Sequence, residues 1–496
     1  MPDTNITLDL LRWAEATPDA PALASESGRL TYRELDTLVW KCAQHLHDHG
    51  VRRGDIVATT FEAGPDHAVA LLALARIGAT ELGIPRSAGA LERRTLAAEA
   101  RAHWLASDRP EGYETGLPAI PVSLRRIAQS PSHTTATMDE VPRAPWQIVR
   151  GSGTTGVPKW MTISHAQARS RFLTEFPGYP VTQADCLAGL SSLEFAGIKH
   201  SLGRAIAAGA CHIACNGPAT NVLGLIAARG VTLLTGSVFH AEQILRVGGP
   251  EVIGALRNLR LLALTSSTVS DGLRARLRER IGDRLMVLYG TNEAWLLTAS
   301  GPPEVFEQAG TVGRALPGVE LEIVDADGRN VPCGETGLVR ARRPGLIDGY
   351  AGDQENTRQH FRDGWFYPGD LGALTADGQL IHRGRADGMM IVNGINLYPG
   401  EIESVLLSHP AVREAAVVAL RTPSSQDVPF AAVTQAPEAA VPDQQLLAYA
   451  AERLGGRRPA AVITMEAIPR TELGKVMRPE LRSRILAHLD RSARSA

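Results

Sequence analysis

The chain of 496 residues is 44% hydrophobic and 21% charged, with a formal net charge of −2 at pH 7. This length is too great for one compact core and predicts two or three packed subdomains of an ordinary water-soluble protein. The balanced charge gives no electrostatic reason to expect nucleic acid or an anionic membrane as a partner, and five cysteines argue against a disulfide framework. No apolar run approaches the ~18 residues of a spanning helix and no signal peptide is recognisable, so we expect a cytoplasmic protein.

Strand-like and helix-like patterns alternate along the chain. Residues 31–49 begin with a capping box at Thr31 and Glu34 and continue as a helix, 54–60 is strand-like, and 67–77 is helical. The alternation recurs in 207–215, 222–228, 232–236 and 261–264. This order favours parallel sheets covered by helices, which is the α/β fold class. Residues 112–144, rich in Ser, Thr and Pro, are predicted to be a surface connection.

The composition changes between residues 379 and 394. A strand-like segment, 379–382, is followed by Gly384-Arg-Ala-Asp387 and then by a shorter unit with its own strand and helix pattern. We therefore predict an N-terminal domain of residues 1–386, a hinge at Asp387, and a small C-terminal domain of residues 387–496.

The stretch Ser152-Gly-Thr-Thr-Gly-Val-Pro-Lys159 has the composition of a phosphate-binding loop. Its glycines expose backbone N–H groups, its hydroxyls add donors, and Lys159 adds a mobile positive charge. It is not a Walker A loop, because Val157 and Pro158 separate Gly156 from Lys159.

Further motifs follow in a fixed order: Tyr289-Gly-Thr-Asn-Glu293, Gly369-Asp370, Gly384-Arg-Ala-Asp387 and Pro469-Arg-Thr-Glu-Leu-Gly-Lys475. With this set the sequence resembles, from about Thr17 to Arg482, the ANL superfamily of acyl- and aryl-CoA synthetases, adenylation domains of peptide synthetases and luciferases. The wording of Asn393-Gly-Ile-Asn-Leu-Tyr-Pro-Gly-Glu is closest to aryl-CoA ligases. The resemblance implies a large N-terminal domain of stacked α/β subdomains and a small, mobile α+β C-terminal domain.

It also implies an ATP site and a role for each motif. The loop residues would hold the β- and γ-phosphates, Tyr289 would stack near adenine, Asp370 would accept the ribose hydroxyls with support from Arg385, and Glu293 would bind Mg²⁺. The predicted nucleotide-binding residues are Ser152, Gly153, Thr154, Thr155, Gly156, Lys159, Tyr289, Gly290, Asn292, Asp370 and Arg385, and the predicted metal ligands are Glu293 and Thr155.

Lys475 is, by the same resemblance, the mobile lysine that reaches the substrate carboxylate and the α-phosphate. The predicted catalytic residues are Lys475, Glu293 and Asp387, the last because rotation about the hinge would remove the lysine before attack by a thiol.

Three departures from the family wording bear on the substrate. Arg150 and Gly151 stand where an aromatic residue and Thr commonly precede the loop, Trp160 replaces a small glycine, and Asn292 replaces a threonine. Adenylation is still expected with these departures, but they open the question of how efficient it is or which acid is activated.

The acid is predicted to bind among segments 193–203, 236–240, 265–268 and 294–297. The predicted substrate-binding residues are Glu194, Phe195, Lys199, Ser266 and Trp295. Two charges in an otherwise apolar pocket favour an aromatic or small unsaturated acid with an amino or hydroxyl group. The alternative is that Glu194 and Lys199 face solvent or each other.

The acceptor of the acyl group is predicted, as the resemblance implies, to be coenzyme A, and since no carrier domain is attached we expect the thiol to come from another molecule. A free-standing carrier protein bearing phosphopantetheine stays open as the acceptor, as does a homodimer as the assembly. ATP-dependent diazotisation of an aromatic amine with nitrite is a second reading, and a non-catalytic nucleotide-binding homologue is a third. The third conflicts with the presence of Lys475 and Glu293.

Overall fold

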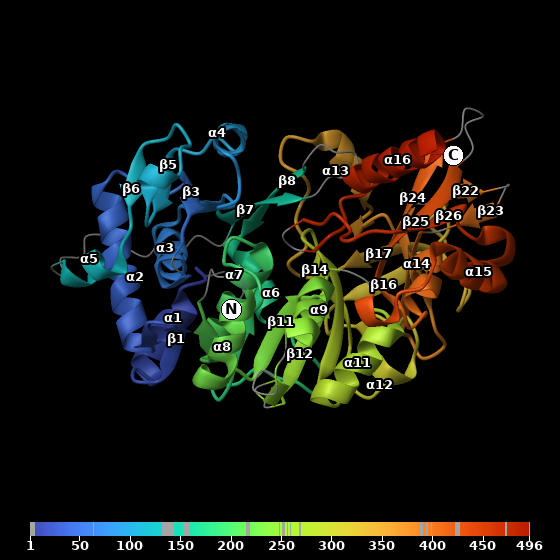
Figure 1. The fold of residues 1–496 in the computed structure, drawn as a ribbon. Coiled ribbons are helices and arrows are strands. Elements are labelled where there is room, and N and C mark those ends of the chain that lie inside the picture. The colour runs from blue at the N-terminus through green and yellow to red at the C-terminus, as the bar shows by residue number, and fades with distance from the viewer. Residues whose placement is uncertain are drawn as a thin grey trace.

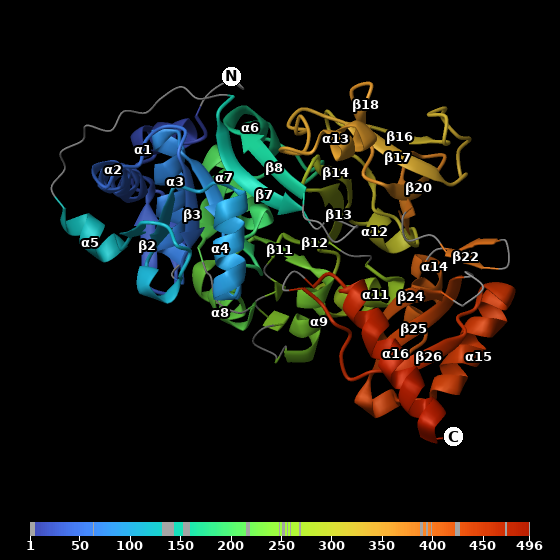
Figure 2. The ribbon, with the colours of Figure 1, turned by 90° about the horizontal axis from the view of Figure 1, so that it is seen from above.

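The computed structural model describes residues 5–62, 64–130, 143–151, 159–214, 219–247, 249, 253–254, 256–257, 259–266, 269–386, 390–392, 395–397, 399–421, 427–471 and 474–495. Two large sheets with helices around them stand side by side, a third sheet lies beyond them, and the C-terminal part packs against one flank (Figures 1 and 2).

The first sheet is parallel except at one edge, where β7 and β8 pair in antiparallel fashion. Its order is β6 (Ala119–Pro121), β5 (Trp104–Ser107), β3 (Ile56–Thr60), β4 (Thr80–Gly83), β7 (Pro145–Gly151) and β8 (Lys159–Ser164). Around it are α1 (Leu8–Ala16), α2 (Tyr32–Asp48), α3 (Gly64–Ile77), α4 (Ala90–Glu99) and α5 (Leu124–Gln129). The expected capping box is present, since Thr31 and Glu34 exchange hydrogen bonds at the start of α2.

The second sheet has a parallel centre with antiparallel pairs at both ends. Its order is β15 (Arg314–Ala315), β14 (Trp295–Ser300), β13 (Leu285–Thr291), β12 (Leu261–Thr265), β11 (Leu233–Ser237), β9 (Cys186–Gly189), β10 (Cys211–Ile213), β1 (Pro21–Ser25) and β2 (Gly28–Thr31). Its helices are α7 (Ala196–Ala208), α8 (Ala219–Arg229), α9 (Val238–Val247) and α11 (Asp271–Ile281), while α6 (His165–Phe172) contacts α7 and the strands β7 and β8 of the first sheet. The predicted α/β class is confirmed.

The predicted surface connection at 112–144 is wrong in part. Residues 119–121 form strand β6, and residues 124–129 form helix α5. Ile120 of the strand and Ile127 of the helix are buried, as are Tyr113 and Val122, so a few scattered apolar side chains anchor these elements within a polar stretch. Residues 131–142 lie outside the described part of the chain.

The third sheet is antiparallel and carries two predicted site residues. Its strands are β16 (Glu320–Val324), β17 (Gly337–Arg342), β18 (Phe361–Arg362), β19 (Trp365–Phe366), β20 (Asp370–Leu374) and β21 (Leu380–Arg385), and α12 (Glu304–Glu307) and α13 (Gln354–His360) lie near it. In the pairing of β20 with β21, Asp370 stands opposite Arg385.

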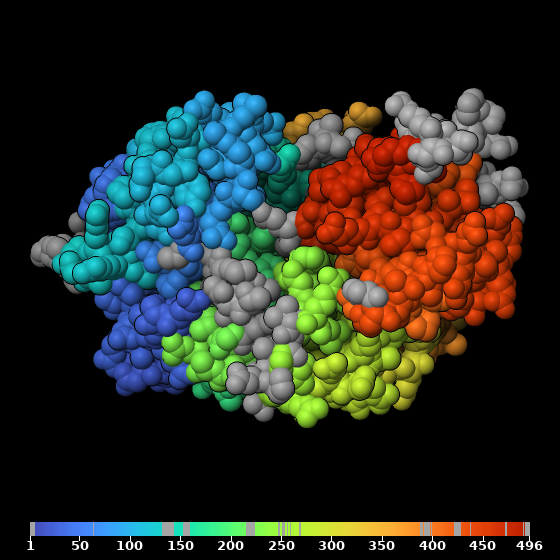
Figure 3. Space-filling model, in the orientation of Figure 1, coloured from blue at the N-terminus to red at the C-terminus, as the bar shows by residue number. Residues whose placement is uncertain are grey.

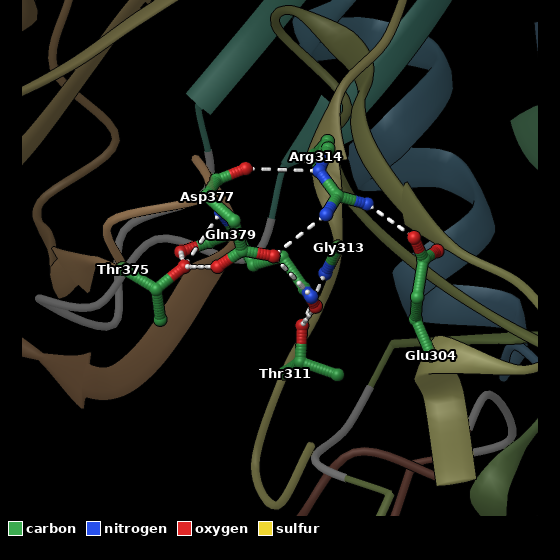
Figure 4. Close-up of polar contacts among 7 residues, drawn as sticks. All are labelled: Glu304, Thr311, Gly313, Arg314, Thr375, Asp377 and Gln379. Carbon is green, nitrogen blue, oxygen red and sulfur yellow. Dashed lines mark hydrogen bonds and ion pairs between the residues drawn. The ribbon is translucent and has the colours of Figure 1, made fainter. Parts of the chain in front are cut away.

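A polar network ties the β20–β21 hairpin to the second sheet (Figure 4). Arg314 donates from Nη2 to Asp377 at 2.6 Å and from Nη1 to Glu304, while Thr311 donates to Gln379 at 2.7 Å. Because the hairpin is held in this way, its other end carries Asp370 and Arg385 at a fixed position relative to β13.

The C-terminal part has hydrophobic cores of its own. It consists of β22 (Met390–Val392), β23 (Ile395–Leu397), α14 (Pro399–Leu407), β24 (Val412–Arg421), β25 (Asp427–Gln435), α15 (Asp443–Leu454), β26 (Ala461–Thr464) and α16 (Arg478–Ser495). Among the described residues, its two core clusters draw on positions between 390 and 489 alone. Asp387 lies outside the described residues, so the hinge and the domain boundary stay predictions.

This part docks on α9 of the N-terminal part. A Cβ built on Gly474 would lie 2.5 Å from Cβ of Phe239 and 3.3 Å from Oγ of Ser237, and Arg246 lies 3.8 Å from Glu414. The space-filling view shows the orange and red surface directly against the yellow-green one (Figure 3). A search of the described residues finds no helix that is long and apolar enough to cross a membrane.

Candidate active site

The predicted phosphate loop connects two paired strands. β7 ends at Gly151 and β8 begins at Lys159, and these two residues are register partners. Ser152, Gly153, Thr154, Thr155 and Gly156 lie outside the described residues, so their roles stay predictions.

Lys159 and Glu293 are joined through Tyr350. The ammonium of Lys159 lies 4.7 Å from the centre of the Tyr350 ring, whose hydroxyl donates to Oε1 of Glu293 at 2.9 Å. Lys159 also lies 2.9 Å from Nε2 of His360. Since Nδ1 of His360 donates to the carbonyl oxygen of Tyr367 at 2.8 Å, Nε2 is the acceptor for Lys159. A cation and a carboxylate that are distant in sequence thus belong to one cluster.

Glu293 lies in the tight turn of a hairpin. Thr291 pairs with Trp295 across β13 and β14, which leaves Asn292, Glu293 and Ala294 as the connecting residues. Gly290 is required beside this turn, because a Cβ there would lie 2.3 Å from the carbonyl oxygen of Trp295. Trp295 itself has φ of +63°, a left-handed conformation that non-glycine residues seldom adopt.

A buried arginine from α6 holds this turn by its backbone. Arg171 is 1% exposed and donates to the carbonyl oxygens of Asn292 at 3.1 Å, Glu293 at 2.7 Å and Gly345 at 2.8 Å. Burial, with the charge of Arg343 nearby, lowers the pKa of Arg171 to about 9. Every contact is to a neutral carbonyl, so the guanidinium fixes the turn and leaves the carboxylate of Glu293 to other partners.

Sequence reasoning missed Arg171, Tyr350 and His360. For Arg171 a signal exists, because it lies on the same helix face as the buried residues His165, Ala168 and Phe172. An arginine on the apolar face of a helix indicates a buried charge with specific acceptors. Tyr350 and His360 follow no comparable local pattern.

Tyr289 and Asp370 are directly bonded. The Tyr289 hydroxyl donates to Oδ2 of Asp370 at 2.6 Å, and Arg385 and His382 lie 3.3 and 3.8 Å from Oδ1. Burial alone would raise the pKa of Asp370, but the contacts with His382, Arg385 and Tyr289 outweigh it and hold this pKa below its usual value. Asp370 is therefore an ionised acceptor, as a ribose-binding carboxylate must be.

The two charged residues of the predicted acid pocket have partners inside the protein. Arg86 donates from Nε to Oε1 of Glu194 at 3.0 Å, and Nζ of Lys199 lies 2.6 Å from both carboxylate oxygens of Glu81. They face neither solvent nor each other. A contact of Glu194 or Lys199 with a substrate stays a prediction, and such a contact would compete with these ion pairs.

The other predicted substrate-binding residues adjoin α7 or follow β12. Phe195 is its N-cap residue, and the half-buried Trp295 stacks on His200 of α7 with ring centres 4.2 Å apart. Ser266 follows β12 with φ of +75° at the carboxyl edge of the second sheet. Trp160, one of the departures noted above, packs on the apolar cluster that contains Leu82, so core packing accounts for it.

Lys475 follows a compact turn at the interface with α9. Thr471 N–H donates to the carbonyl oxygen of Lys475 at 2.8 Å, and Arg470 donates to that of Gly474 at 2.6 Å. Gly474 has φ of +79° and lies against Phe239, while Lys475 is exposed. The predicted catalytic lysine therefore lies where the two parts of the protein meet.

Comparisons with known proteins show the family of the chain. The family of AMP-binding enzymes matches residues 10–351, and the AMP-binding enzyme C-terminal domain matches residues 401–475. The chain is 28% identical to the 3-hydroxybenzoate–CoA/4-hydroxybenzoate–CoA ligase of Thauera aromatica over 96% of both chains. It is 27% identical to a 2-succinylbenzoate–CoA ligase of Bacillus cereus over 95% of this chain and 97% of that one.

Solved structures give the same result. ATP-bound MatB from Rhodopseudomonas palustris superposes with a TM-score of 0.86 at 25% identity, over 97% of this chain and 98% of that one. The amide bond synthetase McbA from Marinactinospora thermotolerans superposes with a TM-score of 0.85 at 26% identity, over 97% and 99%. The fold and site define an adenylate-forming acid–thiol ligase, an enzyme that uses ATP to activate a carboxylic acid. The chain belongs to the AMP-binding enzyme family, as its sequence predicted.

Proposed function

We propose that the protein activates an aromatic carboxylic acid and transfers its acyl group to coenzyme A. A carboxylate oxygen attacks the α-phosphorus of ATP and pyrophosphate leaves; the sulfur of coenzyme A then attacks the carbonyl carbon and AMP leaves. The curated relatives named as ligases of hydroxybenzoate and 2-succinylbenzoate support an aromatic acid.

The observation that carries the proposal is the Lys159–Tyr350–Glu293 cluster. Lys159 provides a cation for phosphate oxygens, and Glu293 provides a carboxylate within the same set of contacts. On this proposal the loop residues 152–156 and Lys159 hold the β- and γ-phosphates, Asn292 adds a polar contact, and Asp370 and Arg385 bind the ribose beside Tyr289. Lys475 would neutralise charge between the acid and the α-phosphate.

The residues fit Mg²⁺ that is bound mainly through the nucleotide. Among the described residues, no group of three or more His, Cys, Asp and Glu could form a protein-only metal site. Mg²⁺ is typically held by one or two carboxylates together with phosphate oxygens and water, and Glu293 can be such a ligand, with Thr155 as the predicted second one. When bound, the ion would neutralise phosphate charge; Tyr350 and Arg171 would orient Glu293 toward it.

Pyrophosphate release across a panel of acids tests the proposal. Benzoate, hydroxybenzoates, aminobenzoates and short aliphatic acids are each supplied with ATP, with and without coenzyme A, and nitrite, a carrier protein and simple amines are tested as alternative co-reactants. We expect pyrophosphate release with an aromatic acid and formation of its coenzyme A thioester. A requirement for nitrite, or acyl transfer to an amine or carrier protein in preference to coenzyme A, would contradict the proposed acceptor.

A further inference from the structure

His240 is a nearly buried histidine whose ring forms hydrogen bonds with described residues through one nitrogen alone. It is 6% exposed and lies in the first turn of α9, directly after β11. Its Nδ1 lies 2.9 Å from Oγ and 3.2 Å from the backbone nitrogen of Ser237, and no other described residue forms a hydrogen bond with its ring. No group in the described part of the chain therefore occupies Nε2.

The contacts of Nδ1 determine the tautomer. The backbone N–H of Ser237 can only donate, so Nδ1 is the acceptor and the ring proton is on Nε2. Burial lowers the pKa of His240 to about 4, so the ring is neutral at neutral pH. The side chain thus presents a fixed, uncharged N–H donor at Nε2.

Helix capping accounts for the hydrogen bonds of Nδ1 but gives no role to the N–H at Nε2. Ser237 and His240 have the spacing of a capping box, in which the third helical residue usually is Glu or Gln and accepts from the N-cap N–H. Thr31 and Glu34 of α2 show the usual form in this protein. A histidine does the same capping through Nδ1 and adds a donor that Glu lacks.

His240 lies close to the proposed reaction centre. β11 is parallel to β9 and β12, and ligands of parallel α/β sheets bind outside the carboxyl ends of the strands. Ser237 is the last residue of β11 and lies against Gly474, the neighbour of Lys475. Ser237, the capping partner of His240, therefore lies next to the turn that carries the predicted catalytic lysine.

We propose that His240 determines substrate specificity by donating a hydrogen bond from Nε2 to an oxygen substituent on the acid. This inference deepens the proposed function and rests on it. A hydroxyl or keto oxygen offers lone pairs to an N–H donor, whereas an ammonium group offers none and the lone pair of an aromatic amine is delocalised into its ring. His240 thus favours hydroxy- or keto-substituted aromatic acids over amino-substituted and unsubstituted ones.

The test compares benzoate, 3- and 4-hydroxybenzoate and 4-aminobenzoate with the wild-type protein, His240→Leu and His240→Gln. In His240→Leu, kcat/KM for the preferred hydroxybenzoate should fall about tenfold relative to that for benzoate, because one hydrogen bond to the substituent is lost. His240→Gln retains an acceptor for the cap and an N–H donor, and should recover most of the preference. Glu34→Leu is the matched control, since it removes the capping acceptor of α2 and should leave the preference unchanged.

Calorimetric binding of the acids without ATP gives a readout independent of turnover. His240→Leu should weaken hydroxybenzoate binding about tenfold and leave benzoate binding unchanged. Equal effects on both acids, or the same change in Glu34→Leu, would overturn the role of His240. Normal acid binding with no pyrophosphate release by the wild-type protein would instead overturn the proposed function, while the binding preference would still support His240.

Discussion

Arg171 donates from Nη2 to the carbonyl oxygen of Glu293 at 2.7 Å. This bond links α6, which directly follows the strand that begins with Lys159, to the hairpin turn that carries the predicted magnesium ligand. One strand–helix unit, β8 and α6, therefore provides Lys159 to the proposed phosphate site and Arg171 to the turn of the proposed metal ligand. Loss of the Arg171 side chain should therefore displace Glu293.

We predict that Arg171→Met raises the Mg²⁺ concentration for half-maximal activity about tenfold, equivalent to ~1.4 kcal/mol. It should also reduce stability by about 3 kcal/mol, because three buried carbonyls lose a charged donor. Arg274→Met is the matched control: Arg274 is similarly buried and donates to the carbonyls of Val269, Val305 and Thr311. Magnesium titrations with denaturation curves separate the two effects, and an equal magnesium shift in both variants would show that Arg171 has no special role.

The buried pair of Lys199 and Glu81 predicts a double-mutant effect. Their side chains are 3% and 0% exposed, so Lys199→Met leaves the Glu81 carboxylate buried without its cation and should reduce stability by about 3–5 kcal/mol. Glu81→Leu combined with Lys199→Met should recover much of this loss. Urea denaturation of the two single variants and the double variant measures the coupling energy. If the stability losses of the single variants simply add in the double variant, the two residues are not coupled.

Stability should fall as the pH drops below 6.5, with His212 as a main cause. Complete burial lowers the pKa of His212 to about 3, and burial lowers the pKa of His165 to about 4. The folded protein therefore excludes a proton that the unfolded chain binds below pH 6.5, so this contribution is fully present above that pH and declines toward pH 3. For His212 the stability lost between pH 7 and pH 5 amounts to about 2 kcal/mol. His212→Leu should lose less stability than the wild-type protein between pH 7 and 5 in urea denaturation, and an equal loss would contradict this role of His212.

Local features of the fold could be predicted from the sequence, and long-range pairings could not. The capping box of α2 depends on residues three positions apart, and strand–helix alternation depends on short windows. Glu194 and Lys199 were recognised as unusual charges, but their partners Arg86 and Glu81 lie 108 and 118 residues away. No periodicity carries information over such separations, so the ion pairs required the folded structure.

Some residues of the candidate site could likewise be predicted from local motifs, and others could not. Ordered motifs predict Lys159, Glu293, Asp370, Arg385 and Lys475 as site residues, because a family resemblance is visible in such motifs. Tyr350 and Arg171, which join or support those residues, lie outside the motifs and become visible only through their contacts. The connection at 112–144 was misjudged because its few buried apolar residues, Tyr113, Ile120, Val122 and Ile127, follow no recognisable period.

The central claim, that Lys475 acts in adenylation at the interface of the two parts, is tested most directly by Lys475→Ala in the two half-reactions. Pyrophosphate exchange with ATP and the acid should fall by about three orders of magnitude, equivalent to ~4 kcal/mol of transition-state stabilisation. Thioester formation from a pre-formed adenylate and coenzyme A should remain close to the wild-type rate. Pyrophosphate exchange near the wild-type rate, or an equal loss in both half-reactions, would contradict the account.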